Sequence, residues 1–116
     1  MIECISAVTL PTEDMARAVA FYTALGFVLK RGGPEARFST FEAGTSYLNL
    51  TMTDVGPPGA RRGRTIFYVG SVDVLYDQAL AAGMKPAFAP RDAAWGERYF
   101  HVSDPDGHEL SFARPL

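Results

Sequence analysis

The sequence predicts an α+β fold in which two βαβββ modules follow one another along the chain. In each half an apolar strand-like run comes first, a short amphipathic helix follows, and alternating strand-like runs complete the order. A glycine follows each predicted helix, at Gly26 and Gly83, so the halves are offset by 83 − 26 = 57 residues. A stretch rich in Gly and Pro separates them. The shared order and the fixed offset indicate an internal duplication.

Length and composition agree with a single globular domain built from those two modules. The chain has 116 residues and a mass of 12.6 kDa, with 47% hydrophobic and 21% charged residues. These fractions are close to the averages of globular proteins and far from those of disordered chains. We expect module one at about residues 1–54, a linker at about 55–62 and module two at about 63–116.

Charge, cysteine content and hydropathy disfavour several classes of function. The net charge of −2 gives no general attraction to phosphate backbones, so we expect no nucleic-acid partner. The single cysteine, Cys4, forms neither an internal disulfide nor a cysteine-based zinc site. No apolar run reaches the ~18 residues that a membrane span requires, and no basic segment leads an apolar one at the N-terminus. We therefore expect no membrane partner and a cytoplasmic location.

The first module begins with an apolar strand at residues 5–10, which ends at Pro11. Thr12, Glu13 and Asp14 then supply the capping groups and negative charge that favour a helix start. The helix of about eleven residues is predicted from apolar side chains at helical spacing, and Gly26 ends it. Three strands follow in the prediction, at residues 27–29, 37–42 and 47–53.

The second module repeats this order. A strand is predicted at residues 64–69, followed by a helix that Ser71 or Asp73 caps and Gly83 ends. Residues 87–89 lie between Pro86 and Pro90 and are predicted to form a short edge strand. The last two strands are expected at residues 97–103 and 108–113, joined by a tight turn over residues 104–107.

Three stretches of this chain resemble the glyoxalase / bleomycin-resistance / extradiol-dioxygenase superfamily, also called the vicinal oxygen chelate fold. They are the first helix with its Phe-Tyr and Leu-Gly-Phe pairs at residues 14–27, the second helix at 72–83, and a terminal hairpin at 95–108. The hairpin, with its Trp-Gly-x-Arg-x-Phe run, is most similar to the bleomycin-resistance-like members. The resemblance implies curled mixed sheets that enclose a concave cavity, and it implies a homodimer.

The resemblance also implies four metal-ligand positions, on the first and last strand of each module. They fall on Ala7, Asn49, Arg64 and Ser111 in this chain, or on Thr65 in place of Arg64 if the count shifts by one. Alanine has no ligand atom, an arginine repels a cation, and the remaining side chains are weak ligands for a divalent metal. We therefore expect neither a metal nor another cofactor at these positions.

Two histidines leave a second metal hypothesis open. His101 and His108 flank the terminal turn and, with Glu109 beside them, have the side-chain chemistry of a zinc site. Two ligands do not define a closed site, and both residues also suit an ordinary strand and turn. The sequence favours the structural interpretation.

Strand alternation predicts which side chains face the cavity. These comprise aromatic, hydroxyl, amide and charged groups, a lining that suits a planar, partly polar molecule. Trp95 is interpreted either as a ring that stacks on the ligand or as a loop anchor on its own module. Arg98 is interpreted either as a contact to an anionic or carbonyl group or as a solvated side chain. The candidate ligand-binding residues are Tyr47, Asn49, Arg64, Tyr68, Trp95, Arg98, Glu109 and Ser111.

The sequence thus favours a metal-free protein that binds and sequesters a small hydrophobic or aromatic ligand, as the bleomycin-resistance proteins do. The alternative is an enzyme of the same superfamily, a lyase, isomerase or dioxygenase with a divergent or absent metal site. Such an enzyme requires a general base in the cavity, for which Glu109 and Tyr68 are the candidates, and no catalytic residue is assigned.

Overall fold

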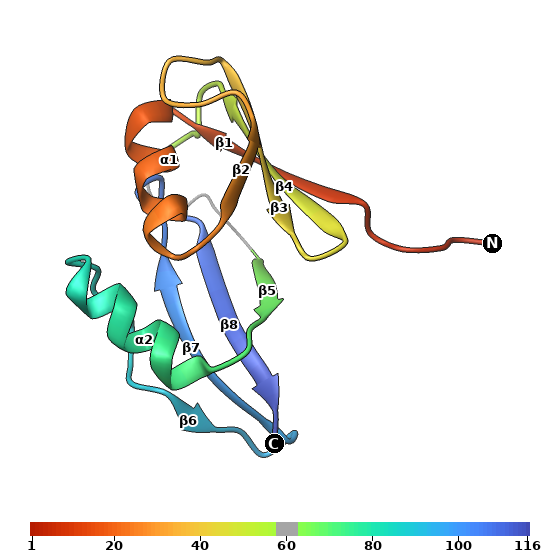
Figure 1. Cartoon of the computed structure of the whole chain (residues 1–116), viewed down its shortest axis with the longest axis vertical. Coiled ribbons are helices and arrows are strands. Elements are labelled where there is room, and N and C mark those ends of the chain that lie inside the picture. Colours follow the sequence, from red (N-terminus) through yellow and green to blue (C-terminus); the bar gives the residue numbers. More distant parts are fainter. Residues whose placement is uncertain (58–62) are drawn as a thin grey trace. The chain divides into compact units, whose positions relative to one another are not determined.

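The computed structural model describes residues 1–57 and 63–116 and divides the chain into two compact units. Unit 1 spans Met1–Pro57 and unit 2 spans Pro58–Leu116. Each unit holds one helix and four strands in the order βαβββ, as the sequence predicts (Figure 1). Residues 58–62 of the expected linker lie outside the described residues.

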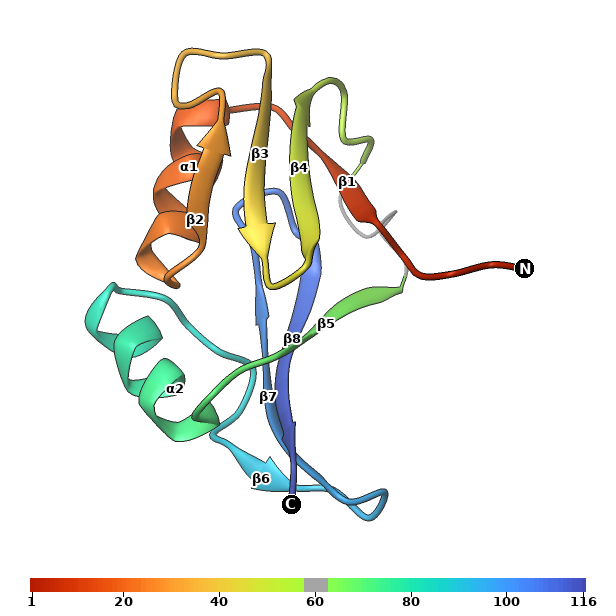
Figure 2. The same ribbon diagram turned by 45° about the vertical axis from the view of Figure 1, so that its right-hand side comes forward.

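Unit 1 is a four-stranded mixed sheet covered on one face by a helix (Figure 2). The strand order is β1-β4-β3-β2, in which β1 runs parallel to β4 and the other neighbours are antiparallel. The parallel pair joins the first and last strands of the module, which is possible because the helix provides the crossover. The elements are β1 (Ala7–Thr12), α1 (Met15–Ala24), β2 (Val28–Arg31), β3 (Phe38–Ala43) and β4 (Ser46–Met52).

The ends of α1 follow from the residues that the sequence analysis singled out. The Asp14 carboxylate accepts the backbone N–H of Arg17 at 3.1 Å and so caps the first turn. Gly26 takes a φ of 94°, the left-handed conformation that terminates helices. The buried face of α1 packs on β3 and β4, where the Tyr22 and Phe41 ring centroids lie 5.8 Å apart.

Unit 2 repeats the same sheet with the strand order β5-β8-β7-β6 and a parallel β5–β8 pair. Its elements are β5 (Arg64–Tyr68), α2 (Val72–Ala81), β6 (Arg91–Asp92), β7 (Glu97–Ser103) and β8 (Glu109–Pro115). The Ser71 hydroxyl caps α2 by accepting the N–H of Val74, which decides between the two predicted caps. The caps Asp14 and Ser71 are 71 − 14 = 57 residues apart, the same offset as the glycines.

The core of unit 2 lies between α2 and one face of its sheet. Phe100 on β7 packs edge-on against Tyr76 of α2 at 5.4 Å and lies 5.6 Å from Phe112 on β8. Phe67 of β5 stacks on Phe112 at 5.5 Å. Even-numbered residues of β7 and β8 thus face the helix, and odd-numbered residues face the other side of the sheet.

The prediction of an edge strand at residues 87–89 is wrong, because β6 instead comprises Arg91 and Asp92. The backbone N–H of Ala87 does donate to the carbonyl of His101 at 2.9 Å, so the segment touches β7 at one point. Pro86 and Pro90 lack the N–H groups that would extend this contact into a ladder. Regular pairing begins only after Pro90, with Arg91 opposite Tyr99.

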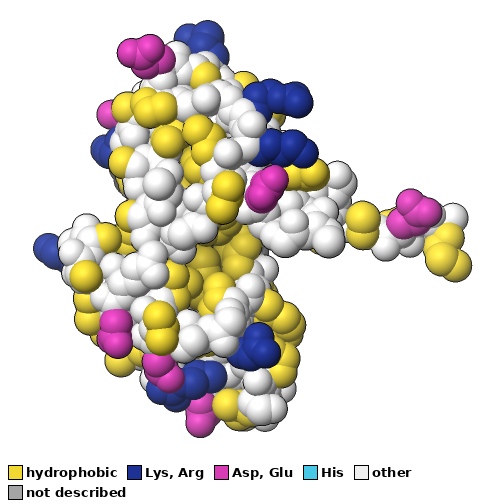
Figure 3. All heavy atoms as spheres, viewed as in Figure 1, with side chains coloured by type: hydrophobic (Ala, Val, Ile, Leu, Met, Phe, Trp, Pro, Cys, Tyr) yellow, Lys and Arg dark blue, Asp and Glu magenta, His cyan; other side chains and the backbone are white. Residues whose placement is uncertain are grey.

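Among the described residues, neither helix combines the length and the apolar content that crossing a lipid bilayer requires. Charged side chains of both signs lie interspersed on the surface seen in Figure 3, with apolar ones between them. The surface in this view therefore has no field of a single sign that would attract a polyanion.

Candidate functional site

The face of the unit 2 sheet turned away from α2 gathers four of the eight predicted ligand-binding residues, Arg64, Tyr68, Glu109 and Ser111. Strand register places Ile66, Ser111 and His101 in one row across β5, β8 and β7. The next row holds Tyr68, Ala113 and Tyr99. We call this surface the unit 2 open face, and it consists of Arg64, Ile66, Tyr68, Glu97, Tyr99, His101, Glu109, Ser111 and Ala113.

The centre of the unit 2 open face is built from small residues and its sides from large ones. Ser111 and Ala113 on β8 are only 4% and 1% exposed. On the edge strand β5, Ile66 and Tyr68 are 58% and 64% exposed. The low exposure of Ser111 and Ala113 shows that larger neighbouring side chains cover the centre, while the β5 side chains stand open to solvent.

Aromatic rings form the β7 side of the open face. The Tyr99 ring lies 5.4 Å from Phe88, 5.2 Å from His101 and 5.3 Å from Trp95. The Arg91 guanidinium lies 3.7 Å from the centroid of the Phe88 ring, and its Nε donates to the Tyr99 hydroxyl at 3.2 Å. These contacts hold the rings in fixed orientations, as a stacking surface for a ligand requires.

Trp95 combines an anchored edge with a free ring face. Its indole N–H donates to Oε1 of Glu97 at 2.9 Å, and yet the residue is 68% exposed. The hydrogen bond agrees with the interpretation of Trp95 as a loop anchor on its own module. Most of the ring surface nevertheless stays exposed, as the interpretation of Trp95 as a stacking ring requires.

Glu97 joins Trp95 to the opposite side of the open face. Its second oxygen, Oε2, accepts a short hydrogen bond from the Tyr68 hydroxyl of β5. This hydrogen bond, reinforced by desolvation and the negative charge of Glu97, raises the pKa of Tyr68. Tyr68 is thus a neutral donor at physiological pH.

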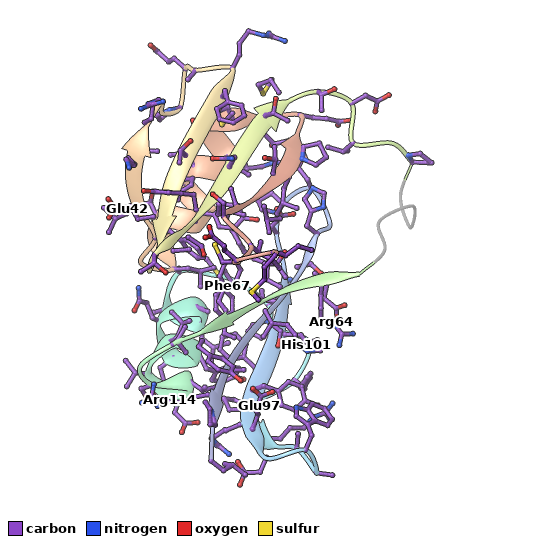
Figure 4. The ribbon with its side chains drawn as sticks, turned by 90° about the vertical axis from the view of Figure 1, so that its right-hand side faces the viewer. Glu42, Arg64, Phe67, Glu97, His101 and Arg114 are labelled. Carbon is purple, nitrogen blue, oxygen red and sulfur yellow. The ribbon has the colours of Figure 1, made fainter. Side chains whose placement is uncertain are left out.

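Arg64, Glu109 and His101 form a charged cluster at the other end of the open face (Figure 4). Arg64 Nε donates to Oε2 of Glu109 at 3.1 Å, and His101 Nδ1 lies 3.0 Å from Oε1. Burial and the positive charge of Arg64 lower the pKa of His101, against the opposing influence of Glu109. His101 is therefore held in its neutral form in the folded protein.

This lowered pKa predicts a loss of stability in weak acid. Because the unfolded chain binds the His101 proton more readily, the free energy of unfolding should fall as the pH drops below about 6.5, the ordinary histidine pKa. The contribution of His101 to the free energy of unfolding is complete above that pH. It is lost progressively as the pH falls toward the lowered pKa of the folded protein. Urea unfolding between pH 7.5 and 5.5 should show a smaller pH dependence for His101→Gln than for the wild type. Equal slopes would contradict this assignment.

Arg98 lies on the opposite face of β7, away from the other predicted ligand-binding residues. Its guanidinium donates to the Asp73 carboxylate of α2 at 2.9 Å and to Asp92 of β6 at 3.0 Å. The hydrogen bonds to Asp73, and then those to Asp92, raise the pKa of Arg98. The sequence already indicates the face on which Arg98 lies. Arg98 and the buried Phe100 are two residues apart on one strand, so both side chains lie on the side that the helix covers. Arg114, labelled in Figure 4, belongs to the same side.

The remaining two predicted residues belong to unit 1. Asn49 on β4 donates through Nδ2 to Thr9 at 3.2 Å and accepts at Oδ1 from Thr40 at 2.8 Å. Tyr47 accepts a hydrogen bond from Lys30 Nζ at 2.9 Å, and the same ammonium lies 4.5 Å from its ring centroid. The polar groups of both residues are thus partnered within the unit 1 sheet.

The residues at the four metal positions that the resemblance implies do not fit a divalent cation. Asn49 uses its amide oxygen on Thr40, and the Arg64 guanidinium is paired with Glu109. Ala7 and Ser111 add at most one hydroxyl. Among the described residues, His, Cys, Asp and Glu form no cluster of three or more with metal-binding geometry. A cationic guanidinium repels a divalent metal ion, and a neutral amide whose oxygen is already hydrogen-bonded is a weak ligand for it.

Sequence reasoning missed Phe88, Arg91, Glu97 and Tyr99 as members of this site. Residues 97, 99 and 101 alternate with Arg98, Phe100 and Val102, so the buried Phe100 already assigns the odd-numbered residues to the open face. Phe88 and Arg91 have no such signal, because they precede regular pairing with β7. Only their contacts with Tyr99 identify them.

The fold defines a class: two-module α+β proteins in which each module is a four-stranded mixed sheet with one helix. The chain belongs to the glyoxalase/bleomycin resistance protein/dioxygenase superfamily, whose family model matches residues 5–112. This confirms the resemblance drawn from the helices and the terminal hairpin.

Among curated proteins, the chain is similar to the Mycobacterium bovis protein Mb0911c, with 42% identity over 122 residues that cover 92% of this chain and 80% of the relative. Among solved structures, TioX from Micromonospora sp. ML1 is 26% identical with a TM-score of 0.80, and the match covers 98% of this chain and 100% of TioX.

Two further structures share the fold at lower identity. A bleomycin-binding protein, solved in complex with bleomycin, is 22% identical with a TM-score of 0.79 and coverage of 99% and 100%. A lactoylglutathione lyase from Agrobacterium tumefaciens is 20% identical with a TM-score of 0.77 and coverage of 97% and 93%. Because a binding protein and a lyase share this fold, the fold alone does not determine what this chain does.

Proposed function

We propose that this protein binds a planar, partly polar small molecule on the unit 2 open face and acts by sequestering it, without a metal. The observation that carries the proposal is the pair of exposed rings, Trp95 and Tyr68, which are both hydrogen-bonded to the Glu97 carboxylate. Large rings that are anchored at one edge and open at the face are typical of stacking surfaces.

The bridge across the open face supports the same proposal. Tyr68 of β5 reaches over β8 to Glu97 of β7 and covers the centre of the sheet, and the residue is 64% exposed as a surface for a flat ligand. The Ser111 hydroxyl, in the neighbouring row, makes no hydrogen bond to another described residue and is available to one polar group of the ligand. Rings for stacking and a few polar groups for orientation are the usual composition of small-molecule sites.

The environments of Glu109 and Tyr68 disfavour the alternative of a metal-free lyase, isomerase or dioxygenase. Each oxygen of Glu109 is engaged, one by Arg64 and one by His101. Tyr68 has a raised pKa, which makes it a poorer base than an ordinary tyrosine. Neither candidate base is arranged to take a proton from a substrate.

Trp95→Ala is expected to weaken ligand binding strongly without unfolding the protein. Ligands would be found by thermal shift of the wild type against planar natural products and antibiotics, where a compound at 100 times its Kd adds about 2.7 kcal/mol of stability. Loss of the Trp95 ring should reduce affinity by at least about tenfold, because buried aromatic contacts dominate such interfaces. Isothermal titration of the variant with the strongest hit measures the change.

Val74→Ala is the matched control, since Val74 is an exposed residue of α2 on the other side of the sheet. It should bind the hit as the wild type does. Equal affinities of the Trp95→Ala variant and the wild type would place the ligand elsewhere and overturn the proposal. Turnover of the hit, detected as a new product by mass spectrometry, would favour the enzyme.

A further inference from the structure

Glu97 is a carboxylate that has no cationic partner among the described residues. Its two oxygens accept hydrogen bonds from neutral donors, the Tyr68 hydroxyl and the Trp95 indole N–H. Across residues 1–57 and 63–116, no Lys, Arg or His side chain lies within ion-pair distance of it. The other acidic residue of the open face, Glu109, is by contrast paired with Arg64.

The hydrogen bonds leave Glu97 with unused capacity. An ionised carboxylate offers about four lone-pair positions, and two of these are occupied by Tyr68 and Trp95. Both donors also fix the orientation of the carboxylate. A pre-oriented carboxylate with free lone pairs binds a charged N–H donor more strongly than a neutral one.

Three aromatic rings surround this carboxylate. Trp95 and Tyr68 are bonded to its two oxygens, and Tyr99 follows two residues along the same face of β7, with its ring 5.3 Å from that of Trp95. The faces of such rings carry partial negative charge and attract organic cations within about 6 Å. The rings and the carboxylate therefore favour the same ligand charge.

The positive groups of the open face lie at other places. Arg64 is bound to Glu109, and the Arg91 guanidinium covers the Phe88 ring. Glu109 is in addition 3.0 Å from His101, so its carboxylate is engaged on both sides. Of the two carboxylates on the open face, Glu97 is thus the one that has no cationic partner among the described residues.

We propose that the ligand of the unit 2 open face is a planar aromatic cation, whose charged nitrogen lies against Glu97 beside the exposed rings of Trp95 and Tyr68. This inference rests on the proposed function and adds the charge class of the ligand. It identifies Glu97 as the residue that selects for that charge.

Three acridines that share one ring system test the charge preference. They are proflavine, a cation at pH 8, neutral acridine, and the anion acridine-9-carboxylate. Isothermal titration at low salt should show that proflavine binds at least about tenfold more tightly than acridine and that the carboxylate binds most weakly. The preference for proflavine should shrink as salt is added, because salt screens partly exposed charges.

Glu97→Gln should reduce proflavine affinity at least tenfold and leave acridine affinity within about threefold. Asp77→Asn removes the same charge from an exposed position on α2 and should change neither affinity. Tyr68→Phe keeps the ring and the carboxylate charge but removes one hydrogen bond, so it should preserve the order of the three ligands. If Glu97→Gln does not fold, the order of the three acridines on the wild type and its salt dependence decide.

Equal or tighter binding of acridine or its carboxylate would overturn the charge assignment and leave the proposed binding function standing. Failure of all three acridines to bind would also overturn it. The proposed function would fail separately, if no planar compound of any charge in the thermal-shift screen raised the melting temperature.

Discussion

Replacing Phe100 by alanine is expected to lower the free energy of unfolding by about 3–5 kcal/mol, the usual cost of truncating a fully buried phenylalanine. Phe100 is 0% exposed and packs between Tyr76 of α2 and Phe112 of β8. Truncation removes the transfer energy of the ring and leaves a cavity that two aromatic neighbours cannot fill. Domains of this kind are stable by about 5–15 kcal/mol, so the variant should be close to unfolding.

Urea denaturation followed by circular dichroism measures this loss. Leu80→Ala is a suitable control, because Leu80 lies on the same helix but is 47% exposed, and its truncation should cost no more than about 1 kcal/mol. A Phe100→Ala midpoint close to that of Leu80→Ala would show that the α2 interface with the sheet is not the core of unit 2. Since Tyr99 and His101 occupy the other face of the same strand, the ligand should in turn stabilise the variant.

Gly32→Ala is expected to cost at least about 3 kcal/mol, through a steric clash combined with a strained backbone. A Cβ at this position would lie 2.4 Å from the carbonyl oxygen of Phe38, 2.6 Å from the Ser39 Oγ and 2.8 Å from the Ser39 Cα. Two of these atoms belong to the backbone of the first two residues of β3, so they cannot rotate away. The φ of 81° adds the cost of a left-handed conformation.

Gly44→Ala separates these two contributions. Gly44 also has a positive φ, 63°, but a Cβ there would meet no atom within 4 Å. Its substitution should cost only about 1–2 kcal/mol. Chemical denaturation of both variants compares them directly, and equal losses would mean that the turn at Gly32 adjusts without penalty.

Ser39 explains why that turn is so closely packed. Its buried hydroxyl accepts the N–H of Gly33 at 3.0 Å and donates to the carbonyl of the same residue at 3.3 Å. The chain after β2 is therefore fastened to the start of β3, and a side chain at position 32 would occupy the space that this contact uses.

The order of elements was predictable because each boundary has a local chemical cause. Asp14 and Gly26 at the ends of α1, and Ser71 and Gly83 at the ends of α2, act through their own backbone and side-chain geometry. Such signals need no knowledge of distant contacts. The open face of β5 was predictable for the same reason, since period-two alternation places Arg64, Ile66 and Tyr68 together.

The errors concern contacts between distant segments. The pairing of β6 depends on where the chain meets β7, and the strand propensity of residues 87–89 does not contain that information. The ion pairs of Arg98 to Asp73 and Asp92 on the helix side likewise depend on distant segments, and its role in ligand binding stays a prediction. The bond between Tyr68 and Glu97 joins strands that are not neighbours, so no local pattern indicates it. The expected homodimer stays a prediction.

The strand order of unit 2 has a consequence for the time at which the open face forms. β8 pairs with β7 across a short turn, whereas its pairing with β5 closes a separation of 45 residues between Arg64 and Glu109. Loop-closure entropy makes the hairpin the early event and the docking of β5 the late one. Tyr68 travels with β5 and therefore reaches Glu97 only at that last step. A newly synthesised chain thus forms the β7–β8 hairpin before the contact between Tyr68 and Glu97, so the proposed ligand would bind only after unit 2 has finished folding.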